Sequence, residues 1–163
     1  MFKLLGNKKF VTTLIYRGSE HGWMIKDFHE RCDSKGPTIT LFKIKDGDCI
    51  GGYTNAKWSS NANYVRDNDA MLFNLNSYRH FPSKKTGWDI GCWDKYGPCF
   101  EGIGGSDLSG YYEPFNGEGK CVSHANKSGY AIPSDGAGLN LLTNRKTGWF
   151  TIIELEVWEV TNA

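Results

Sequence analysis

Two glutamates near the end of the chain form the first pattern that could carry chemistry. Glu154 and Glu156 alternate with apolar residues in FTIIELEVWEV, so in an extended strand they share one face about 7 Å apart. Glycosidases hold an acid and a base carboxylate at such separations around the bond that they cleave. The structural interpretation is two glutamates on a partly wet face that pair with lysine or arginine of a neighbouring strand.

A second pattern combines thiols with an imidazole. Cys92, Cys99, Cys121 and His124 include a Cys-x-x-His step, and thiolates and imidazoles are the ligands of tetrahedral zinc. The gap from Cys92 to Cys99 is wider than the tight pair of a zinc knuckle, and free cysteines usually pack as small apolar residues. The sequence therefore favours packed thiols over a zinc site, and it indicates no cofactor.

The thiol of Cys99 could also act as a nucleophile if the fold brought His29, His80 or His124 beside it. A lone thiol next to Phe100 is more often part of a core, and only a lowered pKa would make it reactive. We expect a core position.

The bulk composition narrows the class of partner. The 19 basic and 18 acidic residues give a net charge of +1, which favours neither nucleic acid nor an anionic membrane surface. The apolar runs are far shorter than the roughly 20 residues that span a bilayer, and MFKLLGNKKF has too little apolar length for a signal peptide. Five cysteines without tight spacing make a poor disulfide framework. We expect a cytoplasmic protein that does not insert into membranes.

The elements that would position these residues are mainly strands. Twenty glycines and 14% aromatic residues are typical of a β-sandwich with many turns. Helical periodicity predicts one helix of about three turns, with Ser19 as its N-cap and Gly36-Pro37 beyond its end. The stretch Gly102–Ser106 lacks the Lys-Ser/Thr of a phosphate-binding loop and predicts a turn.

A hairpin over residues 36–60 organises the rest of the fold. The alternating strand Thr38–Ile44 is followed by Asp46-Gly47, which suits a two-residue turn. Gly51 and Gly52 would let a large ring or a neighbouring backbone come close, and Tyr53 and Trp58 are the expected rings. Such a turn would pair Ile44 with Cys49, Phe42 with Gly51 and Leu41 with Gly52.

The last strand is expected at Trp149–Val160, inside a sheet because both of its faces are largely apolar. The region Tyr111–Gly138 is rich in loops, and its strands cannot be assigned from the sequence. The predicted fold class is therefore mainly β, a two-sheet antiparallel sandwich with one or two peripheral helices.

Several separated motifs resemble the TLDc domain in the same order. They are LIYRGS, the helix ending FHERCD, GPTITLFKI, GGYTNAKWSS, NYVRDNDAMLFNL, YGPCFEG, GGSDL and FTIIELEVWEV. The resemblance implies a two-sheet sandwich with outer helices, and a single domain over residues 1–163 whose N-terminal helical segment is shortened to Phe2–Phe10. It departs from the family at Glu101, where a glycine is common.

The same resemblance implies a function without catalysis. TLDc proteins protect against oxidative damage, and several bind the proton-pumping V-ATPase, so the expected partner is a protein such as the soluble sector of that pump. The implied partner-binding residues are Asp107, Glu154 and Glu156, whereas Gly51, Gly52 and Trp58 are implied to be structural. A scaffold module within a larger protein is equally compatible. Outside the family, the six tryptophans and eight tyrosines leave a carbohydrate-binding or carbohydrate-active sandwich as the alternative; no other small-molecule ligand is expected.

Overall fold

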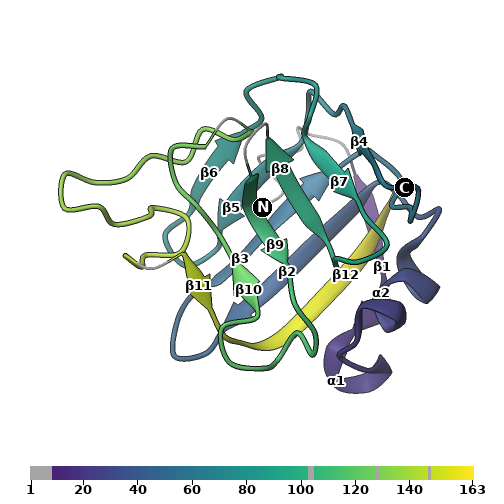
Figure 1. Cartoon of the computed structure of the whole chain (residues 1–163). Coiled ribbons are helices and arrows are strands. Elements are labelled where there is room, and N and C mark those ends of the chain that lie inside the picture. The colour runs from purple at the N-terminus through teal and green to yellow at the C-terminus, as the bar shows by residue number, and fades with distance from the viewer. Residues whose placement is uncertain (1–8, 103–104, 128, 147) are drawn as a thin grey trace.

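The computed structural model describes residues 9–102, 105–127, 129–146 and 148–163, and it shows two antiparallel six-stranded sheets packed face to face (Figure 1). This confirms the predicted fold class. The first sheet contains, in spatial order, β1 (Phe10–Arg17), β12 (Ile152–Asn162), β2 (Thr38–Ile44), β3 (Cys49–Thr54), β5 (Met71–Asn74) and β6 (Arg79–Pro82). The second contains β11 (Trp149–Phe150), β10 (Cys121–Val122), β9 (Gly105–Gly110), β8 (Cys99–Gly102), β7 (Ile90–Cys92) and β4 (Asn63–Val65).

Two sequence predictions fall mainly on residues outside these ranges. They are the shortened N-terminal segment Phe2–Phe10 and the turn within Gly102–Ser106. The described residues of the loop-rich region Tyr111–Gly138 contribute one short strand, β10.

The hairpin of β2 and β3 forms as expected, but its turn is longer than two residues. The Gly47 N–H donates to the Ile44 carbonyl (3.2 Å), and the Ile44 N–H donates to the Asp48 carbonyl (3.0 Å). Three residues therefore lie between Ile44 and Asp48, and Asp46 takes the positive φ of 52°. The expected pairing is wrong by one residue, since Lys43 pairs with Cys49, Leu41 with Gly51 and Thr40 with Gly52.

The terminal segment forms two strands instead of one. β11 belongs to the second sheet and β12 to the first, so the chain crosses between the sheets at Thr151. A bulge between Ile152 and Glu154 opposite β2 then leaves Ile153 exposed. The single strand Trp149–Val160 was thus a wrong prediction. Its position inside a sheet is confirmed for β12, which lies between β1 and β2.

The helical region contains two short helices instead of the one that was predicted. α1 (Gly18–His21) ends at Gly22, whose φ is 107°, and α2 (Ile25–Cys32) begins after Met24. The Asp27 carboxylate accepts the Met24 N–H (2.9 Å) and so caps α2. The single three-turn helix is therefore wrong, although its buried face is correct, because Phe28 and Cys32 are both fully buried. Among the described residues, neither helix has the length and apolarity that a membrane span needs.

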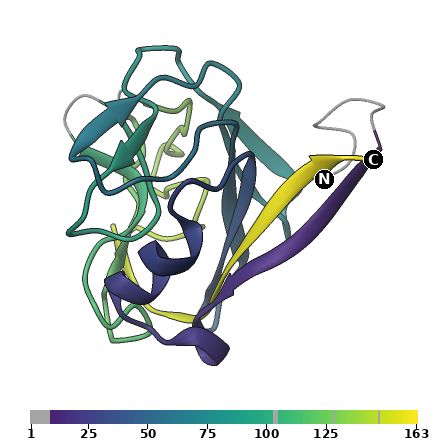
Figure 2. The same cartoon turned by 90° about the vertical axis from the view of Figure 1, so that its right-hand side faces the viewer.

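A chain of aromatic rings runs through the core from the helices to the second sheet. In order the rings are Tyr16, Phe28, Trp58, Phe100 and Tyr130, with successive centroids 6.0, 5.6, 5.7 and 6.1 Å apart. Every contact is edge-to-face, which is a favoured arrangement of aromatic pairs. In Figure 2 the helices lie against the near edge of the sandwich. Phe28 of α2 belongs to the core cluster.

The two adjacent glycines of β3 allow the close approaches that the sequence predicted. A Cβ on Gly51 would overlap the Thr40 backbone oxygen, and a Cβ on Gly52 would overlap the ring of Phe100. The ring over Gly52 thus comes from the opposite sheet and is neither Tyr53 nor Trp58.

Replacing Gly52 with alanine should lower the free energy of unfolding by about 1–3 kcal/mol, because the added methyl overpacks the core against Phe100. Urea denaturation measures the effect. Gly136→Ala is the matched control, since no heavy atom lies within 4 Å of the position of its Cβ. If Phe100→Leu in the Gly52→Ala background relieved none of the loss, the clash would not be its cause.

Candidate functional site

Alternation along β8 gives the second sheet a polar outer face. Phe100 points into the core between the sheets, so its neighbours Cys99 and Glu101 lie on the opposite side. Ser109 of β9 meets them there, with its hydroxyl oxygen 2.8 Å from the Cys99 sulfur. Glu101 is only 5% exposed and Cys99 is fully buried, so the polar groups of this face are covered by other side chains.

The covering side chains surround a cavity of about 420 Å³, called the hollow below. Its floor includes Glu101 and Ser106. Its aromatic walls are formed by Tyr64, Trp93, Tyr96, Tyr111, Tyr112 and Trp149. Many rings around a few convergent polar groups are typical of ligand sites.

The carboxylate of Glu101 accepts three hydrogen bonds from neutral donors. Trp93 Nε1 donates to Oε2 (3.1 Å), while the Cys99 thiol (2.9 Å) and the Ser106 hydroxyl (3.1 Å) donate to Oε1. The ion pairs found among the described residues involve other carboxylates. Glu101 is thus hydrogen-bonded within the fold, but no cation of the described chain pairs with it.

Contacts between neighbouring rings hold the aromatic side chains around the hollow in place. On one side Tyr64 meets Trp93 edge-to-face, with centroids 5.1 Å apart. On the other side Tyr111 stacks on Tyr96 at 4.3 Å, and the two hydroxyls are 2.9 Å apart. The hydrogen bond with Tyr96 and then burial raise the pKa of Tyr111 to about 12. Its phenol is therefore neutral at physiological pH.

A glycine on the next strand makes room for the floor of the hollow. A Cβ on Gly91 of β7 would lie 2.6 Å from Trp93 Nε1 and 2.7 Å from Glu101 Oε2. The indole and the carboxylate can meet over this strand because Gly91 has no side chain.

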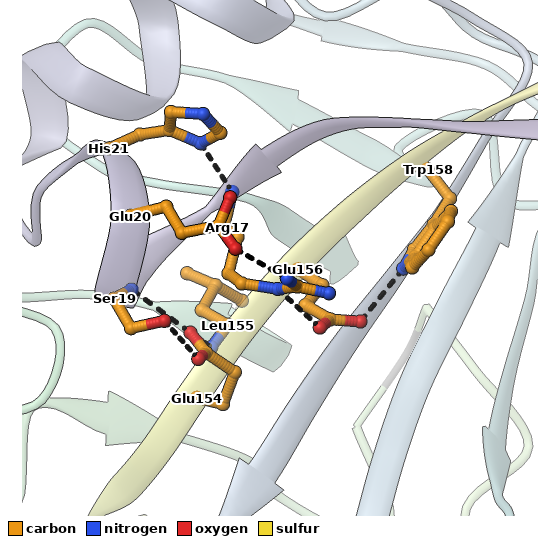
Figure 3. A network of polar contacts seen from close by, with 8 residues as sticks. All are labelled: Arg17, Ser19, Glu20, His21, Glu154, Leu155, Glu156 and Trp158. Atoms are coloured by element: carbon orange, nitrogen blue, oxygen red, sulfur yellow. Dashed lines mark hydrogen bonds and ion pairs between the residues drawn. The ribbon is translucent and has the colours of Figure 1, made fainter.

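The predicted glutamate pair lies elsewhere, where α1 meets β12 (Figure 3). Ser19 donates its hydroxyl to Glu154 Oε2 (2.5 Å) and its N–H to Oε1 (3.2 Å). Glu156 accepts Arg17 Nε on Oε1 (2.8 Å) and Trp158 Nε1 on Oε2 (2.9 Å). The two carboxylates share a face as expected, but each binds different donors of its own chain, and neither lines the hollow. This arrangement ties α1 and β1 to β12.

Asp107, expected on a partner-binding surface, is fully buried. Its Oδ1 accepts the Tyr130 N–H (3.2 Å), and its Oδ2 has no hydrogen-bond partner among the described residues. Burial raises the pKa of Asp107 from 3.8 to about 7, although the backbone N–H groups of Tyr130 and Gly129 oppose the shift. The structure therefore places Asp107 inside the fold and away from the surface.

The predicted sulfur and imidazole set is dispersed among different contacts. Cys92 faces the Lys57 carbonyl (3.9 Å) and Cys121 the Phe115 carbonyl (3.8 Å), whereas Cys99 contacts Glu101. Within the part of the chain that is described, no three His, Cys, Asp or Glu side chains are arranged to hold a metal ion. The remaining member of the set, His124, lines the hollow, and its buried Nδ1 has no hydrogen-bond partner in the part of the chain that the structure describes.

The histidines considered for a nucleophilic pair do not activate Cys99. The contacts of its thiol are with Glu101, Ser106 and Ser109, and burial followed by the charge of Glu101 raises its pKa well above the usual value. His29 instead contacts Asp33 and the Trp93 and Tyr96 carbonyls. The thiol thus keeps its proton, the opposite of what a nucleophile requires.

Sequence reasoning missed the hollow. Glu101 stood out only as a departure from a family pattern. The available signal was the alternation Cys99-Phe100-Glu101 in a short apolar strand, which predicts a carboxylate on the face opposite a core ring.

Comparison with known proteins gives two findings. A family model, described as the TLDc domain, matches residues 3–161. The human protein described as interferon-induced protein 44-like is 36% identical over 77 residues, which cover 45% of this chain and 16% of that protein. The matched part is thus a small share of that relative's length.

Proposed function

Because this chain belongs to the TLDc domain family, we propose that it acts as a non-enzymatic protein-interaction module whose partner is the soluble sector of the V-ATPase. The observation that carries the proposal is the family match over residues 3–161, since the resemblance implies docking without a catalytic set. A partner in that sector implies a cytoplasmic location.

The docking surface that we propose is called the aromatic face and is defined as Trp88, Tyr112 and Trp149. Tyr112 and Trp149 line the hollow, and Trp88 packs on Tyr64, which lines it too. These side chains are 41%, 50% and 44% exposed. Tyr112 stacks on Trp149 with centroids 5.6 Å apart, and Trp88 packs on Tyr64 at 4.6 Å. Neighbouring rings therefore hold these half-exposed side chains in place. Tyr and Trp are residue types that contribute much of the binding energy at protein interfaces.

The proposed protection against oxidation would act through the partner. Burial raises the pKa of all five thiols, at positions 32, 49, 92, 99 and 121. Thiols that keep their proton react slowly with peroxide. The cysteines of this chain are therefore poorly suited to scavenge oxidants themselves.

A pull-down on the purified soluble sector tests the proposal. The chain should bind, and Tyr112→Ala combined with Trp149→Ala should weaken binding by about tenfold or more, because rings at the centre of an interface carry most of its energy. Tyr78→Ala is the control and should bind normally, since Tyr78 is 90% exposed and lies outside the aromatic face. Absence of binding by the unaltered chain would reject this partner, and undiminished binding by the double variant would reject this surface.

A further inference from the structure

The hollow contains a buried negative charge without a described counter-ion. Glu101 is 5% exposed, and its three hydrogen bonds come from an indole, a thiol and a hydroxyl. A carboxylate removed from water is costly unless a positive charge approaches it. The floor of the hollow is therefore suited to a cation.

The walls provide the second requirement of such a site. A ring face attracts a cation within about 6 Å of its centroid. Two lysines of the chain already use rings of the hollow in this way. The ammonium of Lys95 lies 5.3 Å from the centroid of Tyr96, and that of Lys120 lies 5.7 Å from that of Tyr112.

The hollow lies next to the carboxylate, because Glu101 is one of the residues that line it. Trp93 contacts Glu101 through its ring nitrogen, and Tyr64 meets Trp93 at an interplanar angle of 89°. Perpendicular rings form two sides of a cage, which is how proteins hold methylated ammonium groups. The cavity of about 420 Å³ is large enough for a group the size of an amino-acid side chain.

We propose that the hollow binds an organic cation, an alkylammonium or guanidinium group, which lies between its rings with the charge directed at Glu101. This goes beyond the proposed function, because a free amine would occupy the site as well as a lysine or arginine side chain of a docked protein.

Two alternatives to an organic cation in the hollow are a neutral sugar and the side chain of Lys95. A neutral sugar would stack on the rings but would leave the charge of Glu101 unpaired. Lys95 lies at the rim of the hollow over Tyr96 and would repel an incoming cation. Removing its charge should therefore strengthen the binding of a cation.

Calorimetric titration with choline and with its neutral isostere 3,3-dimethylbutanol separates charge from shape. Choline should bind the folded chain at least about tenfold more tightly than the neutral alcohol. Glu101→Gln should reduce choline affinity by about tenfold or more. It should also leave the protein folded in thermal melts, because glutamine keeps an acceptor for the Trp93 N–H. Glu118→Gln, on an exposed residue outside the hollow, is the matched control.

A third variant, Lys95→Gln, tests whether the positive charge at the edge of the hollow weakens choline binding. Lys95→Gln should tighten choline binding by about two- to fivefold, since it removes a like charge from the rim. Equal affinity for choline and the neutral alcohol, unchanged affinity in Glu101→Gln, or binding of N-acetylglucosamine in place of choline would each overturn the proposal.

A parallel pull-down of the soluble ATPase sector shows whether the cation is a side chain of the partner or a free amine. If Glu101→Gln abolishes both choline binding and sector binding, the cation is a side chain of the partner. If it abolishes choline binding alone, the ligand is a free amine. Both results support the cation site, and absence of sector binding by the unaltered chain rejects only the partner.

Discussion

Replacing Trp58 with alanine is expected to lower the free energy of unfolding by about 3–5 kcal/mol, the usual cost of truncating a large buried ring. Trp58 is 2% exposed and stands in the middle of the aromatic chain, with Phe28 on one side and Phe100 on the other. Its Nε1 also donates to Thr38 Oγ1 (2.9 Å). The variant removes contacts to a helix, to β2 and to the opposite sheet together. Urea denaturation followed by circular dichroism measures the loss.

Tyr78→Ala serves as the control for aromatic truncation. Tyr78 is 90% exposed, so its loss should change the free energy of unfolding by no more than about 0.5 kcal/mol. A cost below about 1 kcal/mol for Trp58→Ala would contradict a fold that packs around these rings.

The stability of the protein should fall as the pH rises through the weakly acidic range, because of Asp107. The pKa of Asp107 is raised to about 7 in the folded state, so the folded state holds this proton more tightly than the unfolded state. Below about pH 3 both states are protonated and the effect is absent. Each pKa unit corresponds to about 1.4 kcal/mol, so between about pH 5 and pH 8 this group should cost about 2–3 kcal/mol.

Asp107→Asn should remove this dependence, since asparagine cannot ionise but keeps an acceptor for the Tyr130 N–H. The measurement is urea denaturation of both proteins at several pH values, and the quantity compared is the difference between their unfolding free energies. That difference should move in favour of the variant by about 2–3 kcal/mol on going from about pH 5 to pH 8. Asp94→Asn, on an exposed residue, should leave the pH profile unaltered. A constant difference between Asp107→Asn and the unaltered protein would show that Asp107 is ionised in the folded state throughout.

Predictions from the sequence succeeded where short-range rules decide the structure. In Thr38–Ile44, alternation predicted Phe42 and Ile44 on one face and Ile39 on the other. The structure agrees, since Phe42 and Ile44 belong to the larger core cluster and Ile39 to a separate one. Gly51 and Gly52 predicted close approaches of other groups to β3, because a buried glycine leaves space that a neighbouring group fills. Which ring filled the space depended on the opposite sheet, and no local rule supplies that information.

The misplaced elements share a different cause. The crossing at Thr151 and the bulge before Glu154 arise because one terminal segment must serve both sheets. The helix is divided at Gly22, where α1 and α2 change direction to fit the edge of the sandwich. In each case tertiary packing overrides the secondary structure that the hydrophobic pattern of the sequence predicts.

The candidate site was missed because its residues converge from distant segments. Tyr64, Trp93, Glu101 and Tyr111 lie on or beside separate strands of the second sheet. Reasoning from sequence considered carboxylates that are neighbours in the chain, namely Glu154 and Glu156. Two of the partners of those residues, Ser19 and Arg17, are more than a hundred positions away in the chain, and such pairs cannot be predicted without the fold.

Hydroxyl-radical footprinting of the chain with and without the soluble ATPase sector tests whether the outer face of the second sheet meets the proposed partner. Oxidation of each exposed ring reports its access to solvent. We expect Trp88, Tyr112 and Trp149 to become protected in the complex, while Tyr78 stays as reactive as before. Protection of Tyr78 with unchanged reactivity of the aromatic face would contradict it.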